Sequence, residues 1–194
     1  MWRSYAFILL VGPLSNPAES FGGTSIGKSS YEGARSHDER GTEINAAEPS
    51  TRELEFPDDK AVGIVFVRDV GAHAYATVGW EQIGEAVGRV RVPTDREVML
   101  GVGAAASADL GFLHQLRADD LQVLQFGKAE IPDDALAGVS HLTGLKAVLF
   151  LGTTMDGAAV RHLAELSNLE EIWLQSTPVG DKGVHHLAGM KSLQ

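Results

Sequence analysis

The feature that most constrains the fold is an apolar pattern written three times between Leu121 and Leu193. Leu121, Leu145 and Leu169 open the copies, so the repeat length is 24 residues. Repetition at this length is typical of stacked units that bury their apolar face against a neighbouring unit. The in-phase positions are Leu121, Leu124, Phe126, Ile131, Leu136, Val139 and Leu142; Leu145, Val148, Phe150, Met155, Val160, Leu163 and Leu166; and Leu169, Ile172, Leu174, Val179, Val184, Leu187 and Met190.

Each copy predicts a strand followed by a helix. Leu124 and Phe126 alternate with other residues, as in a strand that buries one face. Leu136, Val139 and Leu142 are three residues apart and therefore share one face of a helix. Stacked copies of this unit place parallel strands on one side and helices on the other.

The copies read L-x-x-L-x-F-x-x-A-x-I, L-x-x-V-x-F-x-x-T-x-M and L-x-x-I-x-L-x-x-T-x-V. This resembles the leucine-rich repeat, L-x-x-L-x-L-x-x-N/C-x-L. Ala129, Thr153 and Thr177 stand where Asn or Cys is usual, so the region is most similar to cysteine-free bacterial repeats. A Thr hydroxyl can bond the turn backbone, whereas Ala129 cannot.

The resemblance covers residues 98–194, because an irregular copy begins at Val98 and has two extra residues before Leu121. It implies an α/β fold: a short leucine-rich repeat solenoid with parallel strands on the concave face and helices outside. It also implies that binding uses the concave face.

Residues 56–97 are predicted to form a small N-terminal β capping unit. Two β-rich runs, Ala61–Val67 and Gly88–Val92, are expected to form this unit, and a third run, Val98–Val102, belongs to the repeats. A cap of this kind is needed because the first repeat otherwise exposes its core-facing side.

The N-terminal part predicts export. Residues 1–20 contain Arg3, the apolar run Tyr5–Gly12 and Pro13, which resembles a secretory signal peptide. The run is shorter than the ~20 apolar residues that span a bilayer, so no stable membrane span is expected. Residues 21–55 are polar and lack apolar periodicity, which predicts a disordered linker. A periplasmic or cell-surface location follows from the signal peptide.

Two motifs in the linker match by letters alone. Gly22–Ser29 fits the phosphate-binding loop G-x-x-x-x-G-K-S, and Gly23–Gly27 fits the nucleophile elbow G-x-S-x-G. Both motifs need a strand before them and a helix after them to position backbone donors. Neither element is predicted here, so nucleotide binding and serine hydrolysis are not expected.

Composition excludes further classes of function. The chain has no cysteine, which rules out disulfides, Cys-ligated zinc and thiol catalysis. The net charge is −10 without a Lys/Arg cluster, so nucleic acid is not an expected partner. His162 and His186 recur at one repeat position, but no carboxylate ligand accompanies them, so no metal site is predicted. No cofactor and no enzyme activity are expected.

We therefore expect a protein–protein interaction module that binds an unidentified protein on the concave face. Alternation in the strands selects outward side chains, which are expected to form an exposed apolar stripe with polar neighbours. The predicted partner-binding residues are Leu149, Leu151, Trp173, Glu171, Gln175 and Gln125.

Leu193 holds the first position of a fourth copy, so the open C-terminal repeat is expected to be available for pairing with another chain. Three alternatives stay open: a substrate-recognition adaptor of the ubiquitin-ligase type, a fragment of a larger receptor or enzyme, and a hydrolase that uses His73, Asp69 and Glu81.

Overall fold

The computed structural model describes residues 50–71, 77–155 and 157–194. Contacts divide the chain into two units, Met1–Ala46 and Ala47–Gln194, and every described residue belongs to the second unit. The predicted signal peptide at 1–20 and residues 21–49 of the predicted linker lie outside the described residues. Among the residues described, no helix has the length and apolar character needed to cross a bilayer.

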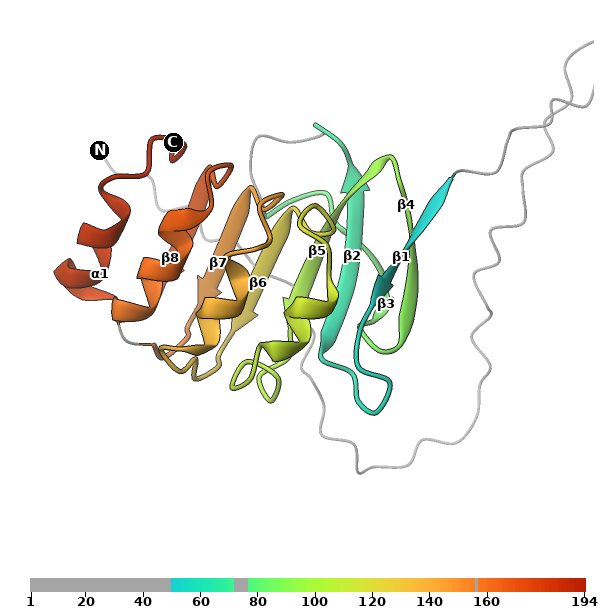
Figure 1. The fold of residues 1–194 in the computed structure, drawn as a ribbon, viewed down its shortest axis with the longest axis horizontal. Helices are drawn as coiled ribbons and strands as arrows, with labels where there is room; N and C mark the ends of the chain where they lie inside the picture. The colour runs from blue at the N-terminus through green and yellow to red at the C-terminus, as the bar shows by residue number, and fades with distance from the viewer. Residues whose placement is uncertain (1–49, 72–76, 156) are drawn as a thin grey trace, which may run out of the picture. The chain divides into compact units, whose positions relative to one another are not determined.

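The described unit is an α/β fold with more strand than helix (Figure 1). In chain order, the elements are β1 (Thr51–Glu55), β2 (Gly63–Asp69), β3 (Glu81–Glu85), β4 (Arg89–Pro93), β5 (Arg96–Val102), η1 (Gly111–Gln115), β6 (Val123–Gly127), η2 (Ala135–Val139), β7 (Ala147–Leu151), η3 (Gly157–Glu165), β8 (Glu171–Gln175) and α1 (Gly180–Leu187).

Six strands form one mixed sheet in the order β3-β2-β5-β6-β7-β8. The strands β5 to β8 are parallel, and β2 and β3 extend the sheet with antiparallel pairing. Val123 pairs with Ala147 and Ala147 with Glu171, so neighbouring parallel strands are in register at the sequence repeat of 24 residues. A slip of one residue would turn every apolar side chain to the opposite face, so the repeat pattern fixes this register.

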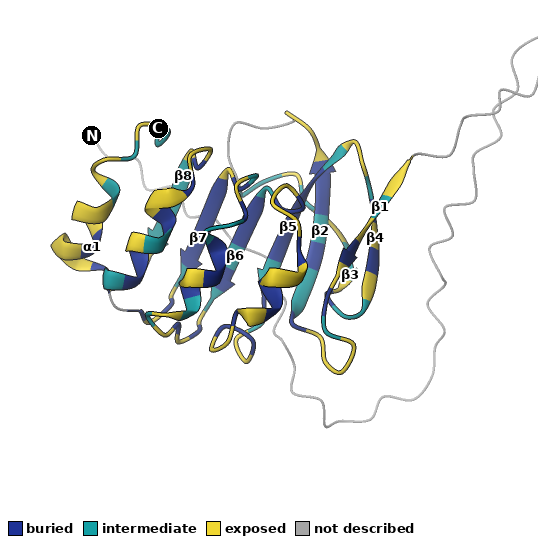
Figure 2. Ribbon diagram, viewed as in Figure 1, coloured by how far each residue is buried: buried dark blue, intermediate teal, exposed yellow. Residues whose placement is uncertain are grey.

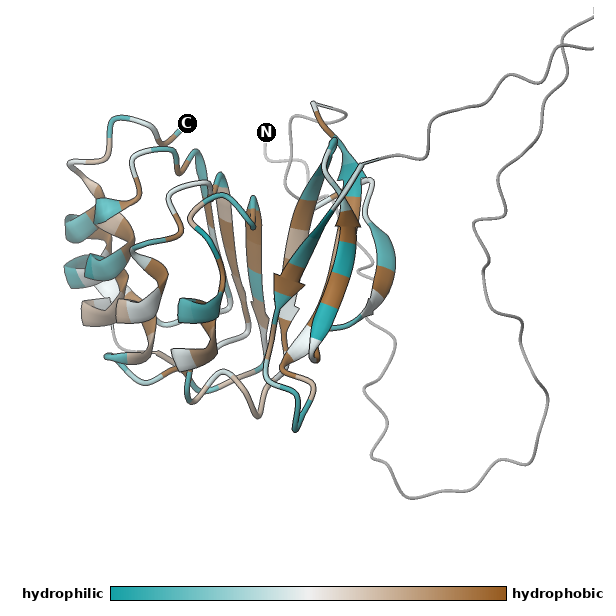
Figure 3. Ribbon diagram, turned by 45° about the vertical axis from the view of Figure 1, so that its right-hand side comes forward, coloured by the Kyte–Doolittle hydropathy of each residue, from teal (hydrophilic) through white to brown (hydrophobic). Residues whose placement is uncertain are grey.

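A helical segment follows each of the parallel strands, and all four segments lie on the same side of the sheet (Figures 1 and 3). The predicted order of strand and helix is therefore confirmed. However, η1, η2 and η3 are 3-10 helices, and only α1 is an α-helix. The spacing of three between Leu136 and Val139 matches the three residues per turn of a 3-10 helix.

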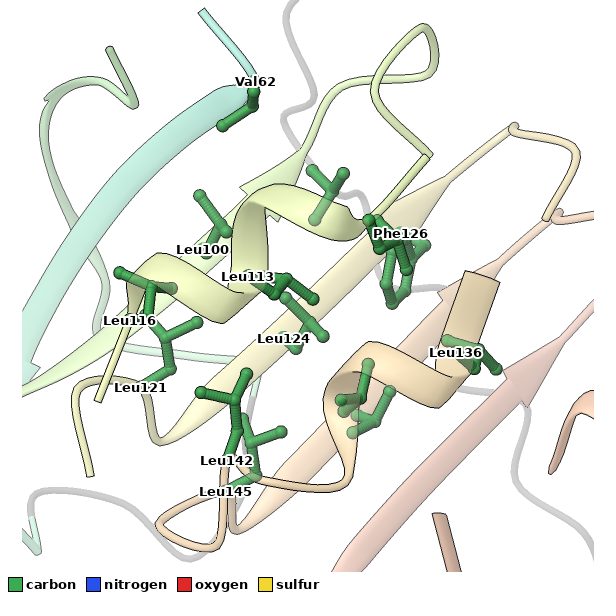
Figure 4. Close-up of a cluster of buried hydrophobic side chains, with 14 of the residues drawn as sticks. Val62, Leu100, Leu113, Leu116, Leu121, Leu124, Phe126, Leu136, Leu142 and Leu145 are labelled. Atoms are coloured by element: carbon green, nitrogen blue, oxygen red, sulfur yellow. The ribbon is translucent and has the colours of Figure 1, made fainter. Parts of the chain in front are cut away.

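The main core lies between the sheet and these helical segments (Figures 2 and 4). Leu124 and Phe126 are fully buried there, as their alternation predicts. The rings of Phe126 and Phe150, one repeat apart, stack with centroids 5.3 Å apart and an interplanar angle of 6°. Burial of each such side chain contributes about 1.5–3 kcal/mol, so the in-phase rows are the main source of cohesion between copies.

The predicted N-terminal boundaries need correction. Thr51–Glu55, assigned to the disordered linker, form β1, which pairs with β4 in a separate two-stranded sheet. The prediction overlooked the alternation of Leu54 and Phe56, both of which are buried in the main core.

The two β-rich runs at residues 61–67 and 88–92 were also predicted to form one small unit, and this is wrong. The first run contributes to β2, which pairs with β5 and with the unpredicted strand β3; the second contributes to β4, which pairs with β1. Antiparallel pairing along the whole of β5 buries Val65 and Val67 in the same core as the repeats. The six-stranded sheet therefore continues through this region, and the separate sheet of β1 and β4 adds Leu54, Val90 and Val92 to the same core.

A matched pair of glycine substitutions tests the junction between β2 and β5. A Cβ on Gly63 would clash with the Gly101 carbonyl oxygen, whereas nothing lies within 4 Å of a Cβ on Gly84. We expect Gly63→Ala to destabilise the protein by about 1–3 kcal/mol, because backbone atoms must shift. Gly84→Ala should be nearly neutral in urea unfolding. Equal stabilities of the two variants would contradict the close approach.

Candidate functional site

The candidate binding surface is the face of the sheet that points away from the helical segments, here termed the strand-side face. Side chains that alternate with the core residues occupy it on the parallel strands. On β6, β7 and β8 its members are Val123, Gln125, Gly127, Ala147, Leu149, Leu151, Glu171, Trp173 and Gln175.

The centre of the strand-side face is more buried than the sequence predicts. Leu149 is only 1 % exposed, and Val123 and Ala147 are buried beside it. These residues form a second apolar cluster with Met99, and partly buried Phe66, Trp80, Leu151 and Trp173 pack against that cluster. The prediction of Leu149 as part of an exposed stripe is therefore wrong: large side chains on the flanking strands pack around it.

The remaining predicted binding residues stay accessible. Leu151, Trp173, Gln125 and Glu171 are half-buried, and Gln175 is exposed. The register places Leu151 beside Gln175 on β7 and β8. The indole Nε1 of Trp173 donates a hydrogen bond to Oε2 of Glu171 at 2.8 Å. This bond fixes the Trp173 ring against its own strand, so the surface is a preorganised apolar patch with an acidic edge.

A buried ionic cluster lies on the same face, around β2 and β5. Oε2 of Glu97 accepts from Nε of Arg68 at 2.7 Å, and Oε1 of Glu97 accepts from Nζ of Lys146 at 2.7 Å. The side chains of Glu97 and Arg68 are almost fully buried, whereas that of Lys146 is half-exposed. The Arg68 guanidinium also lies 4.4 Å from the centroid of the Trp80 ring. These contacts tie the antiparallel part of the sheet to the turn before β7.

Burial disfavours the charged form of Glu97, but hydrogen bonds from Lys146 and Arg68 and the charges of both partners outweigh it. The net result is a pKa of Glu97 below its ordinary value. The carboxylate is thus held ionised by its two partners and is unsuited to donate a proton near neutral pH. We read the cluster as structural support for the strand-side face.

Sequence reasoning did not identify this cluster. The local sequence pattern singles out none of its three members, Arg68, Glu97 and Lys146. Alternation in β5 would have placed Glu97 on the same face as Met99. Arg68 reaches Glu97 only because β2 pairs with β5 and sets these two residues opposite each other. The local sequence pattern does not specify this long-range pairing.

The alternative hydrolase site lies only partly within the described residues. His73 lies outside the described residues. Asp69 is exposed and forms a salt bridge of 3.1 Å with Arg96. Across the described ranges, no group of three or more His, Asp and Glu side chains is arranged to hold a metal ion.

In comparisons with known proteins, the chain matches no protein-family model and no curated protein.

The ionic cluster makes stability depend on pH. Because the folded-state pKa of Glu97 is lowered, its contribution is present above the unfolded pKa of about 4.3 and is lost as pH falls through the folded pKa. We expect Glu97→Gln to cost about 3 kcal/mol at pH 7, since Arg68 loses its buried counter-ion. The variant should also lose less stability than the wild type below pH 4.

Glu53→Gln is the matched control, because Glu53 pairs with Arg91 at 3.1 Å on the exposed surface. It should change the free energy of unfolding by less than about 1 kcal/mol. Urea unfolding at several pH values measures both variants. A Glu97→Gln variant as stable as Glu53→Gln at pH 7 would exclude a structural role for the cluster.

Proposed function

We propose that the chain is a non-enzymatic protein-binding module built on a short leucine-rich repeat solenoid. Support for the repeat class comes from the 24-residue register of the parallel strands and the helical segment after each strand. The hydroxyls of Thr153 and Thr177 are hydrogen-bonded to each other, with 3.0 Å between their Oγ1 atoms. Both residues stand at the position where such repeats carry Asn or Cys.

The observation that carries the binding proposal is the half-buried apolar pair Leu151 and Trp173 beside polar Glu171 and Gln175. Aromatic side chains in partly desolvated settings contribute strongly to protein interfaces. Gln125 extends this surface onto the neighbouring strand β6, where it lies beside Leu149. Leu149 supports the surface from beneath and is not proposed to touch the partner.

The partner is proposed to be a protein that inserts an apolar side chain between Leu151 and Trp173. Donor groups, either backbone amides or a basic side chain, would meet Glu171 and Gln175. Export to the periplasm or cell surface remains a prediction from residues 1–20, so the proposed partner is an extracytoplasmic protein.

Affinity capture with quantitative mass spectrometry tests this surface. We expect Leu151→Ala and Trp173→Ala each to lower capture of a specific partner at least ten-fold, as loss of an interface hot spot does. Val70→Ala is the matched control, since Val70 is a largely exposed apolar residue at the end of β2. Circular dichroism verifies that each variant is folded. Undiminished capture by both folded variants would refute the proposed surface.

A further inference from the structure

Gln125 is a polar residue in the middle of an apolar surface. It belongs to β6, an inner strand of the six-stranded sheet (Figure 1), and alternation places it on the strand-side face. Its neighbours across the sheet are Gly101 on β5 and Leu149 on β7. Its neighbours along β6 on the same face are Val123 and Gly127. None of these four residues has a polar side chain, so none offers a side-chain partner to the Gln125 amide.

The Gln125 amide also has no hydrogen-bond partner elsewhere among the described residues. Gln122, on the segment just before β6, shows what such an amide can do. Its Oε1 accepts from the N–H of Val98 at 2.8 Å, and its Nε2 donates to the carbonyl of Asp119 at 2.8 Å. One glutamine thus pairs with a main-chain donor and a main-chain acceptor. Half-buried Gln125 has the same capacity, which only solvent fills in the isolated chain.

A partner on the strand-side face has to replace that solvent. The sheet surface around the amide is already dry, since Val123 and Leu149 are each 1 % exposed. Covering Gln125 removes the remaining water, and a buried amide without hydrogen bonds weakens binding. The partner must therefore bring an acceptor for Nε2 and a donor for Oε1 to the same place.

This requirement separates the classes of apolar partner. A lipid acyl chain offers neither group, and a helix has its main-chain N–H and C=O groups bonded to each other. An extended polypeptide segment has unpaired main-chain groups next to apolar side chains. The nearby buried carboxylate of Glu97 makes no demand on a partner, because both of its oxygens accept from cations of the chain. A neutral main chain therefore fits best.

We infer that the proposed partner docks as an extended segment across the strand-side face, with one of its peptide groups paired to the Gln125 amide. This inference rests on the proposed function and specifies the conformation of the partner. The strand spacing of ~4.8 Å and the rise of ~3.3 Å per residue place Leu151 about 8 Å from Gln125. An extended segment covers that distance in about two residues, so the apolar side chain at Leu151 comes two residues from the paired peptide group.

Gly127 leaves room for this approach. The register sets it beside Leu151, and nothing lies within 4 Å of a Cβ added to it. The main chain of β6 is therefore not covered by a side chain at this position. A large side chain here would block the segment without entering the core.

Peptide selection tests the inference. Short random peptides displayed on phage are selected on the immobilised chain, and fluorescence anisotropy measures the affinity of the selected peptides. Gln125→Leu removes the amide and keeps a side chain of similar size, so binding should weaken roughly five- to hundred-fold. Gly127→Leu should weaken it at least ten-fold by obstruction. Circular dichroism verifies that both variants are folded.

Gln115→Leu and Gly189→Leu are the matched controls. Gln115 is an exposed glutamine on η1, and Gly189 is an exposed glycine that follows α1, so both belong to the helical side of the sheet (Figure 1). A Cβ on Gly189 also meets nothing within 4 Å. Both substitutions should leave peptide binding unchanged.

N-methylation of single peptide groups in a selected peptide locates the main-chain contact. At one position it should weaken binding to the unmodified chain roughly five- to hundred-fold, and there it should add nothing to the effect of Gln125→Leu. Methylation effects that are independent of Gln125 overturn the inference, because the amide then does not read the main chain.

The selection distinguishes failure of this inference from failure of the proposed surface. Binding that is lost in Leu151→Ala and Trp173→Ala but unaffected by Gln125→Leu overturns the inference and leaves the surface in place. A selection that yields no binding peptide also overturns the inference, whereas affinity capture of a folded protein partner still tests the surface.

Discussion

The fold depends on one constraint: each copy buries its apolar rows only where a neighbouring copy or strand covers them. Leu124, Val148 and Ile172 occupy equivalent positions on consecutive strands, and the first two are fully buried while the last is partly exposed. The chemistry of the three side chains is similar, so the difference comes from their neighbours. Stability in such an array is a sum of interfaces between adjacent units, and within the described residues β8 pairs with a strand on one side only.

At the N-terminal end of the sheet, added strands cover the apolar rows of the first copy. At the N-terminal end, β2 and β3 continue the sheet, and β1 and β4 add Leu54, Val90 and Val92 to the same core. The outer strand there, β3, is short and contains two glutamates, which discourages further pairing. The buried contact of Glu97 with Arg68 and Lys146 holds this addition to the repeats through side chains from β2, β5 and the turn before β7. A buried carboxylate with two cationic partners fixes orientation as much as it stabilises.

The local pattern was sufficient to predict the repeated part. The period of 24 residues placed the strands and the helical segments after them, and alternation identified Leu124 and Phe126 as core residues. These features follow from contacts between equivalent positions of neighbouring copies, and those positions can be recognised directly from the repeated sequence. The Thr177 hydroxyl bonds the backbone carbonyls of Phe150 on β7 and Gln175 on β8, each at 3.3 Å, so its partners are strand residues and not the turn that the sequence predicts.

The N-terminal region and the strand-side face could not be predicted in the same way. The pairing of β1 with β4 joins residues about forty apart, and β2 pairs with the distant strand β5 as well as with its neighbour β3. Leu149 was placed on the correct face, but its burial depends on side chains from other strands, including Trp173 and Met99. Alternation shows the side of a sheet to which a residue points, whereas its exposure is set by tertiary neighbours.

Trp173 is the residue on which the proposed contact surface depends most. Its ring packs against the second apolar cluster, and its Nε1 donates to Oε2 of Glu171 at 2.8 Å. The ring is therefore held in one orientation before any partner is bound. A side chain that is ordered in advance loses less conformational freedom on binding, so the proposed partner would gain more net affinity from Trp173 than from a mobile side chain of equal area.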